Sequence, residues 1–270
     1  MSGVPAPSGR WSDLRTRILS AIFMVSVGAV EIWLGGTAFA ALVIVLTALM
    51  VWELATITAP LRRRTPVTLA VATGGALAAA LVLRSEVAVL FLVAPTLMLV
   101  LTPRRDRRLA GGYALAIMLA GYGLVTLRQE AGTIAILWLV AVVVASDVLG
   151  YFAGRLLGGP KFWERISPKK TWSGTAAGWI GAGLVGLAFW QAGYGGWPLV
   201  PLSMLVAFAG QMGDILESWV KRRAGVKDAS RLIPGHGGVL DRFDALIGAV
   251  VLVMLLQLVV PVTPMIGGPG

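Results

Sequence analysis

The stretch GTIAILWLVAVVVASDVLGYFAG, residues 132–154, decides the fold class because it holds 23 residues with a single charge, Asp147. A helix needs roughly 20 consecutive apolar residues to cross the hydrocarbon core of a bilayer. Eight further runs of similar character cover the approximate ranges 18–35, 37–57, 67–83, 87–102, 109–127, 174–193, 197–217 and 244–263. The sequence therefore predicts an all-α, polytopic integral membrane protein with about nine transmembrane helices.

The composition of the 270 residues agrees with a membrane-embedded chain. Hydrophobic residues make up 57% and charged residues 13%, whereas about 25% charged residues is usual in soluble proteins. The absence of cysteine excludes disulfides, thiolate metal sites and cysteine nucleophiles. The net charge of +10 indicates basic loops that face anionic lipid headgroups or phosphorylated substrates. Because this charge is divided among short loops, we do not expect nucleic acid as a partner.

The basic residues predict the orientation in the membrane. If the N-terminal tail, residues 1–17, is cytoplasmic, 21 of the 23 Lys and Arg residues lie on the cytoplasmic side and only Arg84 and Arg128 lie outside. This asymmetry is the usual positive-inside distribution. We therefore expect a cytoplasmic N-terminus, a C-terminus on the outer side, an N-terminal transmembrane bundle over 18–130 and a catalytic transmembrane region over 131–270.

Two cytoplasmic segments, 155–173 and 218–243, are longer than a helix connection requires and mix acids with bases. Five carboxylates lie in or beside them: Asp147, Asp214, Glu217, Asp241 and Asp244. Hard oxygen ligands that converge beside many cations are typical of a site for Mg²⁺ and phosphate. Helix capping with a salt bridge to Arg242 or Lys221 is the alternative interpretation. Two further acids lie elsewhere and are expected to be bundle-interior or helix-end groups: Glu31 and Glu53.

The basic residues of the two segments fit a polyphosphate. The run SPKKT, residues 167–171, offers two ammonium groups and two hydroxyls just before a helix that we expect to begin near Gly174. A helix start of this kind favours an anion. The later segment adds three basic residues, Lys221, Arg222 and Lys227. A positive-inside anchor is the alternative for both groups, although Asp228 and the glycines that follow favour a functional role.

The run PGHGG, residues 234–238, is the most informative short motif. Glycine lacks a Cβ atom and tolerates positive φ, so backbone N–H groups here can approach an anion closely. A tight turn in which His236 only hydrogen-bonds backbone is the alternative. A phosphate nucleophile is already anionic and needs no general base, so we expect His236 to position or neutralise charge. With one His and no Cys, a zinc site is excluded.

Together these segments resemble the C-terminal signature of the phosphatidate cytidylyltransferases, or CDP-diacylglycerol synthases. The resemblance rests on Ser218-x-x-Lys221-Arg222-x-x-x-x-Lys227-Asp228, followed by IPGHGGVLDRFD at 233–244. It also rests on Asp147…Tyr151-x-x-Gly154-Arg155-x-x-Gly158, on ISPKKTW at 166–172 and on GDxxES at 213–218. These matches cover roughly the last 130 residues. The first half is similar only in hydropathy and length.

The resemblance implies that CTP and phosphatidate are converted to CDP-diacylglycerol and pyrophosphate by an Mg²⁺-dependent, dimeric membrane enzyme. The implied metal-binding or catalytic residues are Asp214, Asp241 and Asp244, with Lys221 and Arg222 as further catalytic groups. The implied substrate-binding residues are Ser167, Lys169, Lys170, Thr171, Ser218, Lys227, Asp228, Gly235, His236, Gly237, Gly238 and Arg242. We expect phosphatidate to enter from the cytoplasmic leaflet of a bacterial inner membrane, with the active site facing the cytoplasm.

The sequence departs from the family pattern at Ser173, at Val148-Leu149-Gly150 and at Ala229. These departures bear on recognition of the base and ribose and leave the acids untouched. Two other functions use similar residues. A CTP-dependent lipid or polyprenol kinase would activate a hydroxyl and would require a general base. A transporter would spread its carboxylates through the membrane depth, whereas these cluster on one side.

Overall fold

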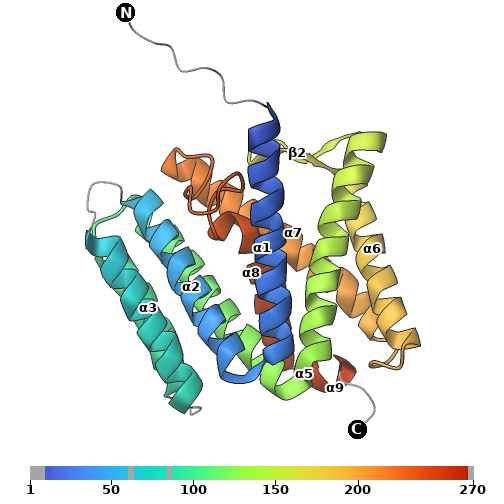
Figure 1. Ribbon diagram of the computed structural model, residues 1–270, viewed down its shortest axis with the longest axis horizontal. Coiled ribbons are helices and arrows are strands. Elements are labelled where there is room, and N and C mark those ends of the chain that lie inside the picture. Colours follow the sequence, from blue (N-terminus) through green and yellow to red (C-terminus); the bar gives the residue numbers. More distant parts are fainter. Residues whose placement is uncertain (1–9, 60–63, 84–86, 267–270) are drawn as a thin grey trace, which may run out of the picture.

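The computed structural model describes residues 10–59, 64–83 and 87–266 (Figure 1). Its helices are α1 (Arg10–Leu34), α2 (Gly36–Thr58), α3 (Arg64–Leu83), α4 (Ala88–Leu101), α5 (Arg107–Leu157), α6 (Trp172–Gln191), α7 (Leu199–Ala224), α8 (Leu240–Gln257) and α9 (Thr263–Ile266). Residues 1–9 of the predicted tail lie outside the described residues, as do Arg62, Arg63 and Arg84.

The helices confirm that the chain is a helical membrane protein. Within the described ranges, five helices are long and apolar enough to cross a membrane, namely α1 from Leu14, α2, α3 from Thr65, α5 and α7. Large apolar side chains stay exposed along them, such as Phe23 on α1 and Val71 on α3, as expected of surfaces that face lipid. The number of crossings and the orientation stay predictions.

Two predicted helices, 109–127 and 132–154, are both contained in α5. Gly132 separates the two halves with φ 76° and ψ −169°, a conformation that glycine adopts without steric cost. The chain bends there, and the second half leads to the polar end of the molecule (Figure 1). The buried core centres on α5, whose Trp138 and Tyr113 are fully buried. Trp138 donates from Nε1 to Ser203 Oγ of α7 at 2.9 Å, which ties the second half of α5 to α7.

Several predicted boundaries differ from the structure. Helix α1 begins at Arg10, so the end of the predicted tail is helical. Helix α7 continues to Ala224, so the start of the predicted segment 218–243 is helical as well. Helix α8 begins at Leu240, four residues before the predicted start. These ends are polar, and hydropathy marks only the apolar part of each helix.

The predicted all-α fold class is confirmed, and the chain adds one small hairpin that was not predicted. Strand β1 (Lys161–Trp163) pairs antiparallel with β2 (Ser167–Thr171), where the sequence predicts a loop. Helix α6 then begins at Trp172, two residues before the predicted start. Thr171 caps it by accepting a hydrogen bond from Gly174 N at 3.2 Å. The hairpin therefore leads the SPKKT run directly into a capped helix start.

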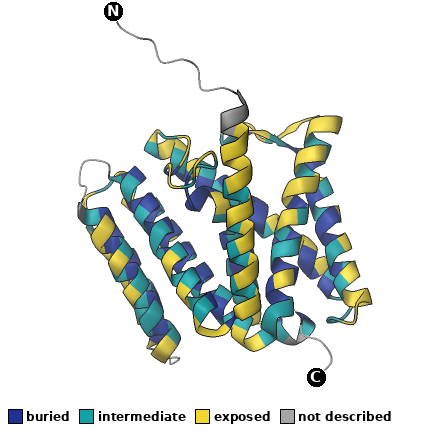
Figure 2. Ribbon diagram, in the orientation of Figure 1, coloured by how far each residue is buried: buried dark blue, intermediate teal, exposed yellow. Residues whose placement is uncertain are grey.

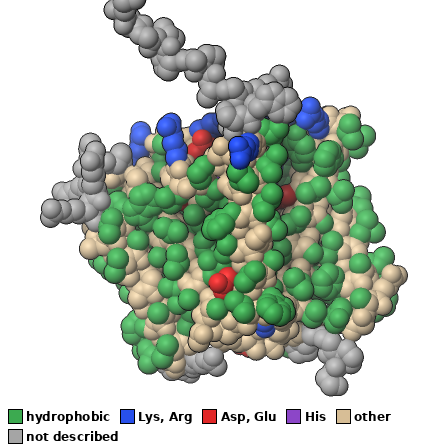
Figure 3. Space-filling model, viewed as in Figure 1, with side chains coloured by type: hydrophobic (Ala, Val, Ile, Leu, Met, Phe, Trp, Pro, Cys, Tyr) green, Lys and Arg blue, Asp and Glu red, His purple; other side chains and the backbone are tan. Residues whose placement is uncertain are grey.

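The polar segments gather at one end of the molecule. Figure 1 places β2, the start of α1 and the chain before α8 at the same end, and α9 at the other. Lys and Arg side chains gather at that end of the face shown in Figure 3, where apolar side chains cover most of the remaining surface. Helix α1 crosses this face and is largely exposed along its length (Figure 2). The molecule is therefore a helical bundle with a largely apolar surface and one polar end.

Candidate active site

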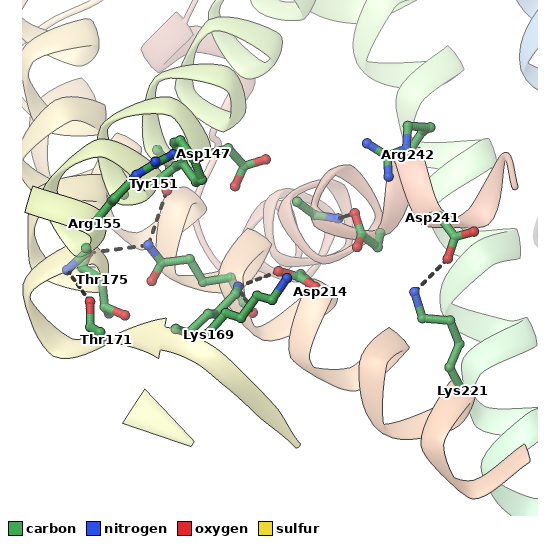
Figure 4. A pocket seen from close by; sticks show the side chains of 18 of the residues that line it. Asp147, Tyr151, Arg155, Lys169, Thr171, Thr175, Asp214, Lys221, Asp241 and Arg242 are labelled. Atoms are coloured by element: carbon green, nitrogen blue, oxygen red, sulfur yellow. Dashed lines mark hydrogen bonds and ion pairs between the residues drawn. The ribbon is translucent and has the colours of Figure 1, made fainter. Parts of the chain in front are cut away.

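A cavity of about 530 Å³ opens at the polar end, between the second half of α5, β2, α6, α7 and the start of α8 (Figure 4). The charged residues that line it are Asp147, Arg155, Lys169, Lys170, Asp214, Lys221, Asp228, Asp241, Arg242 and Asp244. Its uncharged polar lining includes Ser146, Tyr151, Thr171, Thr175 and Gln211. Acidic and basic side chains thus line the same cavity at the polar end of the apolar bundle.

Three carboxylates converge at the edge of this cavity, where Asp214 and Asp244 line it and Glu217 lies buried behind them. One oxygen each from Asp214, Glu217 and Asp244 lies within 4.8 Å of the other two. Asp214 and Glu217 lie one turn apart on α7, and Asp244 lies in the second turn of α8. Glu217 is fully buried, and its Oε1 has no hydrogen-bond partner within the described part of the chain. Hard oxygen donors with an unused buried oxygen fit a divalent cation such as Mg²⁺.

This cluster differs from the predicted metal set because Glu217 takes the place of Asp241. Asp241 Oδ1 lies 2.6 Å from Lys221 Nζ. Its Oδ2 accepts hydrogen bonds from the backbone N–H groups of Ala229 at 2.9 Å and Gly238 at 2.7 Å. Asp241 therefore holds the chain before α8, and its predicted role as a metal ligand stays a prediction.

Two lysines neutralise these carboxylates. Lys221 Nζ lies 2.5 Å from Glu217 Oε2 and 2.6 Å from Asp241 Oδ1, so it joins α7 to α8. Lys170 Nζ of β2 lies 2.6 Å from Asp214 Oδ2 and donates to the Gln211 carbonyl at 3.4 Å. The hairpin therefore delivers its ammonium group to α7. Figure 4 shows Lys221 pointing toward Asp241 across the cavity.

The glycines of the run do not line the cavity, and the prediction that their amides bind a substrate phosphate stays a prediction. Gly238 N–H is used by Asp241. The next two amides, of Val239 and Leu240, donate to Glu53 at 2.9 and 2.6 Å. Within the run, the Gly238 amide therefore binds a carboxylate of the protein itself, and the two amides that follow the run do the same.

His236 faces α1 rather than the cavity. Its Nδ1 lies 2.8 Å from Ser20 Oγ, which also lies 3.0 Å from the Pro234 carbonyl oxygen. Helix α1 thus contacts the PGHGG turn through one hydroxyl. This geometry favours the alternative of a turn residue over a role at the reacting phosphates.

The other predicted substrate-binding residues divide into two groups. The cavity is lined by Lys169, Lys170, Thr171, Asp228 and Arg242. The structure places outside its lining Ser167, Ser218, Arg222, Lys227, Gly235, His236, Gly237 and Gly238. Ser218 still donates to Asp214 Oδ1 at 3.4 Å, one turn along α7. Arg222 donates to the carbonyl of Val226 at 3.4 Å, so it closes the end of its own helix.

A stripe of residues on α5 also belongs to the site, although the sequence indicated Asp147 only as one of five carboxylates and Tyr151, Gly154 and Arg155 only as part of the family resemblance. Ser146, Asp147, Gly150, Tyr151, Gly154 and Arg155 all line the cavity. Arg155 donates to Tyr151 Oη at 2.8 Å. Their spacing of three and four residues places them on one helix face, and this signal could have been used.

A model of the cytidylyltransferase family matches residues 15–260. The chain belongs to the cytidylyltransferase family. It is 37% identical over 255 residues to a phosphatidate cytidylyltransferase of Brucella abortus biovar 1 (strain 9-941), covering 90% of this chain and 93% of the relative. It is 42% identical over 138 residues to the Helicobacter pylori J99 protein of the same name, covering 50% and 52% of the two chains.

The family match includes the N-terminal helices, one of which supplies a residue that sequence reasoning missed. Glu53 of α2 was expected to be a bundle-interior or helix-end group, and it is indeed fully buried. In this member of the cytidylyltransferase family its carboxylate contacts the chain just before α8. A lone acid in an apolar run is the one sequence signal, since such a group needs a partner. The sequence does not reveal which partner it has.

Proposed function

We propose that this protein transfers the cytidylyl group of CTP to phosphatidate, giving CDP-diacylglycerol and pyrophosphate in phospholipid biosynthesis. Membership of the cytidylyltransferase family and the names of the relatives support the reaction class. The observation that carries the proposal is the cavity, where a carboxylate cluster and five basic side chains meet at the polar end of an apolar bundle. A lipid headgroup and a water-soluble nucleotide can both reach such a boundary.

In the proposed reaction a phosphate oxygen of phosphatidate attacks the α-phosphorus of CTP. A P–O bond forms there, and the bond from the α-phosphorus to the oxygen bridging to the β-phosphorus breaks. Pyrophosphate leaves with that electron pair. Because the attacking oxygen is already anionic, no side chain has to remove a proton. The protein's task is to hold two anions in line for displacement and to offset their charge.

The basic residues of the cavity supply this charge. Lys169 and Lys170 enter from β2, and we assign them to the triphosphate of CTP. Lys221 and Arg242 enter from α7 and α8, beside the carboxylates, and we assign them to the transferring group. Fixed cations in a partly enclosed site stabilise developing negative charge with little reorganisation.

Asp214, Glu217 and Asp244 would hold Mg²⁺. Their convergence and the unpartnered Oε1 of Glu217 support this assignment. When bound, the ion would stabilise negative charge on the transferring phosphoryl group. Without it, Lys170 and Lys221 keep the carboxylates close together by pairing with Asp214 and Glu217.

The two alternative functions fit the site less well. A CTP-dependent kinase needs His236 or an Asp as general base for a hydroxyl nucleophile. His236 contacts Ser20 instead of lining the cavity, and two of the aspartates in the cavity are paired with lysines. A transporter needs polar groups along a path through the membrane. The acids that line the cavity gather instead at one end of the bundle.

We further propose a bacterial inner-membrane location, a cytoplasm-facing site and a homodimer. The bacterial sources of the relatives support a bacterial membrane. The gathering of basic residues at one end supports the cytoplasmic orientation. The dimer follows from the family resemblance alone.

Purified protein in mixed micelles with phosphatidate and Mg²⁺ tests the reaction directly. With CTP labelled at the α-phosphorus, the label is expected in the lipid fraction, and with γ-labelled CTP it is expected in pyrophosphate. Label in lipid from the γ position would indicate a kinase. No label in lipid from either position would contradict both reactions.

Lys170→Ala is expected to raise the KM for CTP about tenfold or more, with a smaller change in the KM for phosphatidate. The reason is the loss of a charge-assisted contact to phosphate. Lys161→Ala is the matched control, because Lys161 lies in the same hairpin, is exposed and lies outside the cavity lining. An equal CTP dependence in the two variants would remove Lys170 from the nucleotide site.

A further inference from the structure

We propose that Glu53 of α2 is a positioning residue of the active site, which fixes the start of α8 and with it Asp244. The catalytic part of this inference rests on the proposed function. The structural part concerns only how the chain before α8 is held. It gives the N-terminal half of the chain, which the family match includes, a defined role at the site.

Glu53 binds the first amides of α8 from a distant part of the chain. Its Oε1 accepts from Val239 N–H at 2.9 Å, and its Oε2 accepts from Leu240 N–H at 2.6 Å. Val239, at the N-cap of α8, makes no side-chain capping hydrogen bond. Most helices use a nearby Ser, Thr, Asp or Asn for this purpose. Here the carboxylate of another helix does it.

The same carboxylate also holds the other end of the preceding loop. Ser230 Oγ donates to Glu53 Oε1 at 2.5 Å. A Cβ atom on Gly238 would lie 2.5 Å from Oε1 and 2.8 Å from Oε2 of Glu53. A side chain at position 238 would therefore displace the Glu53 carboxylate from its place beside the loop. This explains one glycine of the PGHGG run without a substrate.

Two carboxylates, one from each half of the chain, thus share the polar groups of residues 229–240. Asp241 accepts from Ala229 and Gly238, while Glu53 accepts from Ser230, Val239 and Leu240. Asp244 lies one helical turn beyond Leu240, so a shift of the helix start moves its carboxylate in the cluster with Asp214 and Glu217. Displacements of about 1 Å in a reacting site can cost about a hundredfold in rate.

The burial of Glu53 argues against an incidental cap. A carboxylate at membrane depth is costly unless it is well partnered, and Glu53 is 0% exposed. Helix α8 could be capped locally at no such cost. The cost of burying Glu53 is offset if its carboxylate fixes the start of α8, because catalysis requires a fixed geometry of the groups around the reacting site.

Glu53→Gln tests the inference, since the amide keeps the size of the side chain but brings an NH₂ group to one of the backbone donors. Hydrogen–deuterium exchange of the detergent-solubilised full chain is expected to rise at least tenfold in peptides from 229–244 and to stay unchanged in α6. In the α-label assay, kcat is expected to fall about tenfold or more, with the KM for CTP changed less than twofold.

Thr47→Val is the matched control. Thr47 is also buried on α2, and its hydroxyl donates to the Val43 carbonyl at 2.7 Å, away from the cavity. It is expected to leave both readouts near wild type even if it lowers thermal stability. The positioning role would be overturned if Glu53→Gln exchanged faster along the whole chain rather than in 229–244. It would also be overturned if the kcat of Glu53→Gln lay within twofold of the kcat of Thr47→Val.

Two further measurements apply if Glu53→Gln does not fold or if the wild-type protein is inactive. If Glu53→Gln does not fold, Ser230→Ala removes one contact to Glu53, and exchange at 229–240 should rise about threefold; no rise would overturn the inference. If the wild-type protein transfers no cytidylyl group, the proposed function fails. Exchange at 229–244 then still supports or refutes the anchoring role of Glu53, because it needs no substrate.

Discussion

Asp244→Asn is expected to reduce cytidylyl transfer about a thousandfold or more, while the protein still inserts and folds. The carboxamide keeps the shape of the side chain but removes one of three negative charges that converge with Asp214 and Glu217. Loss of a ligand charge weakens a site for a hard cation, and the metal and its electrostatic stabilisation are large contributions to phosphoryl-transfer chemistry. The α-label assay measures the loss, and a monodisperse elution profile in detergent reports folding.

Asp106→Asn is the matched control for this substitution. Asp106 lies before α5 and accepts hydrogen bonds from Nε and Nη2 of Arg223, both at 2.8 Å. These bonds hold the pKa of the Asp106 carboxyl below its ordinary value. It lies outside the cavity lining, so turnover should stay within about twofold of wild type. Asp244→Asn with more than a tenth of wild-type turnover would remove Asp244 from the catalytic cluster.

Lys221→Met is expected to cause the largest loss of stability among single substitutions at the site. The ammonium group lies between Glu217 and Asp241, whose side chains are 1% and 4% exposed. Removing it leaves two buried carboxylates without their shared counter-ion, which costs about 3–5 kcal/mol for a broken buried pair. Denaturation by SDS from mild detergent, followed by tryptophan fluorescence, measures the change.

Lys170→Met provides the comparison, because Lys170 and its partner Asp214 are 23% and 31% exposed. Solvent screens that pair, so its loss should cost about 1 kcal/mol or less. The double variant Lys221→Met/Glu217→Gln should recover part of the stability lost in Lys221→Met, since one uncompensated charge is then removed. Equal losses for both lysines, or no recovery, would show that Lys221 does not stabilise the cluster.

Much of the fold could be predicted because the bilayer acts on long, local features of the sequence. Each predicted apolar run overlaps a helix of the described chain. The boundaries were less certain, since a helix such as α7 extends beyond its apolar part to Ala224. The β1–β2 hairpin was missed for a similar reason. Its strands have only three and five residues, too few to show a clear alternation of apolar and polar residues.

The sequence predicted which region of the chain forms the site, but it did not predict which side chains contact one another there. Spacing put Asp214 and Glu217 on one face of a helix, yet it could not tell whether Glu217 or Asp241 completes the cluster. That choice depends on how α7 and α8 are rotated against each other. The contact of Glu53 with Val239 spans 186 positions of the chain, and no local pattern contains it. The glycine run predicted a backbone–anion contact, and its Gly238 amide donates to Asp241, a carboxylate that no local pattern singled out as its partner.

The central claim is that α7 and α8 hold a divalent cation between nucleotide and lipid phosphate at the polar end of the bundle. Anomalous X-ray scattering from crystals grown with Mn²⁺ and CTP tests it most directly. We predict an anomalous peak at coordinating distance from carboxylate oxygens of Asp214, Glu217 and Asp244, next to the α-phosphate of CTP. A fully occupied Mn²⁺ peak elsewhere, with these three side chains turned away from it, would contradict the claim.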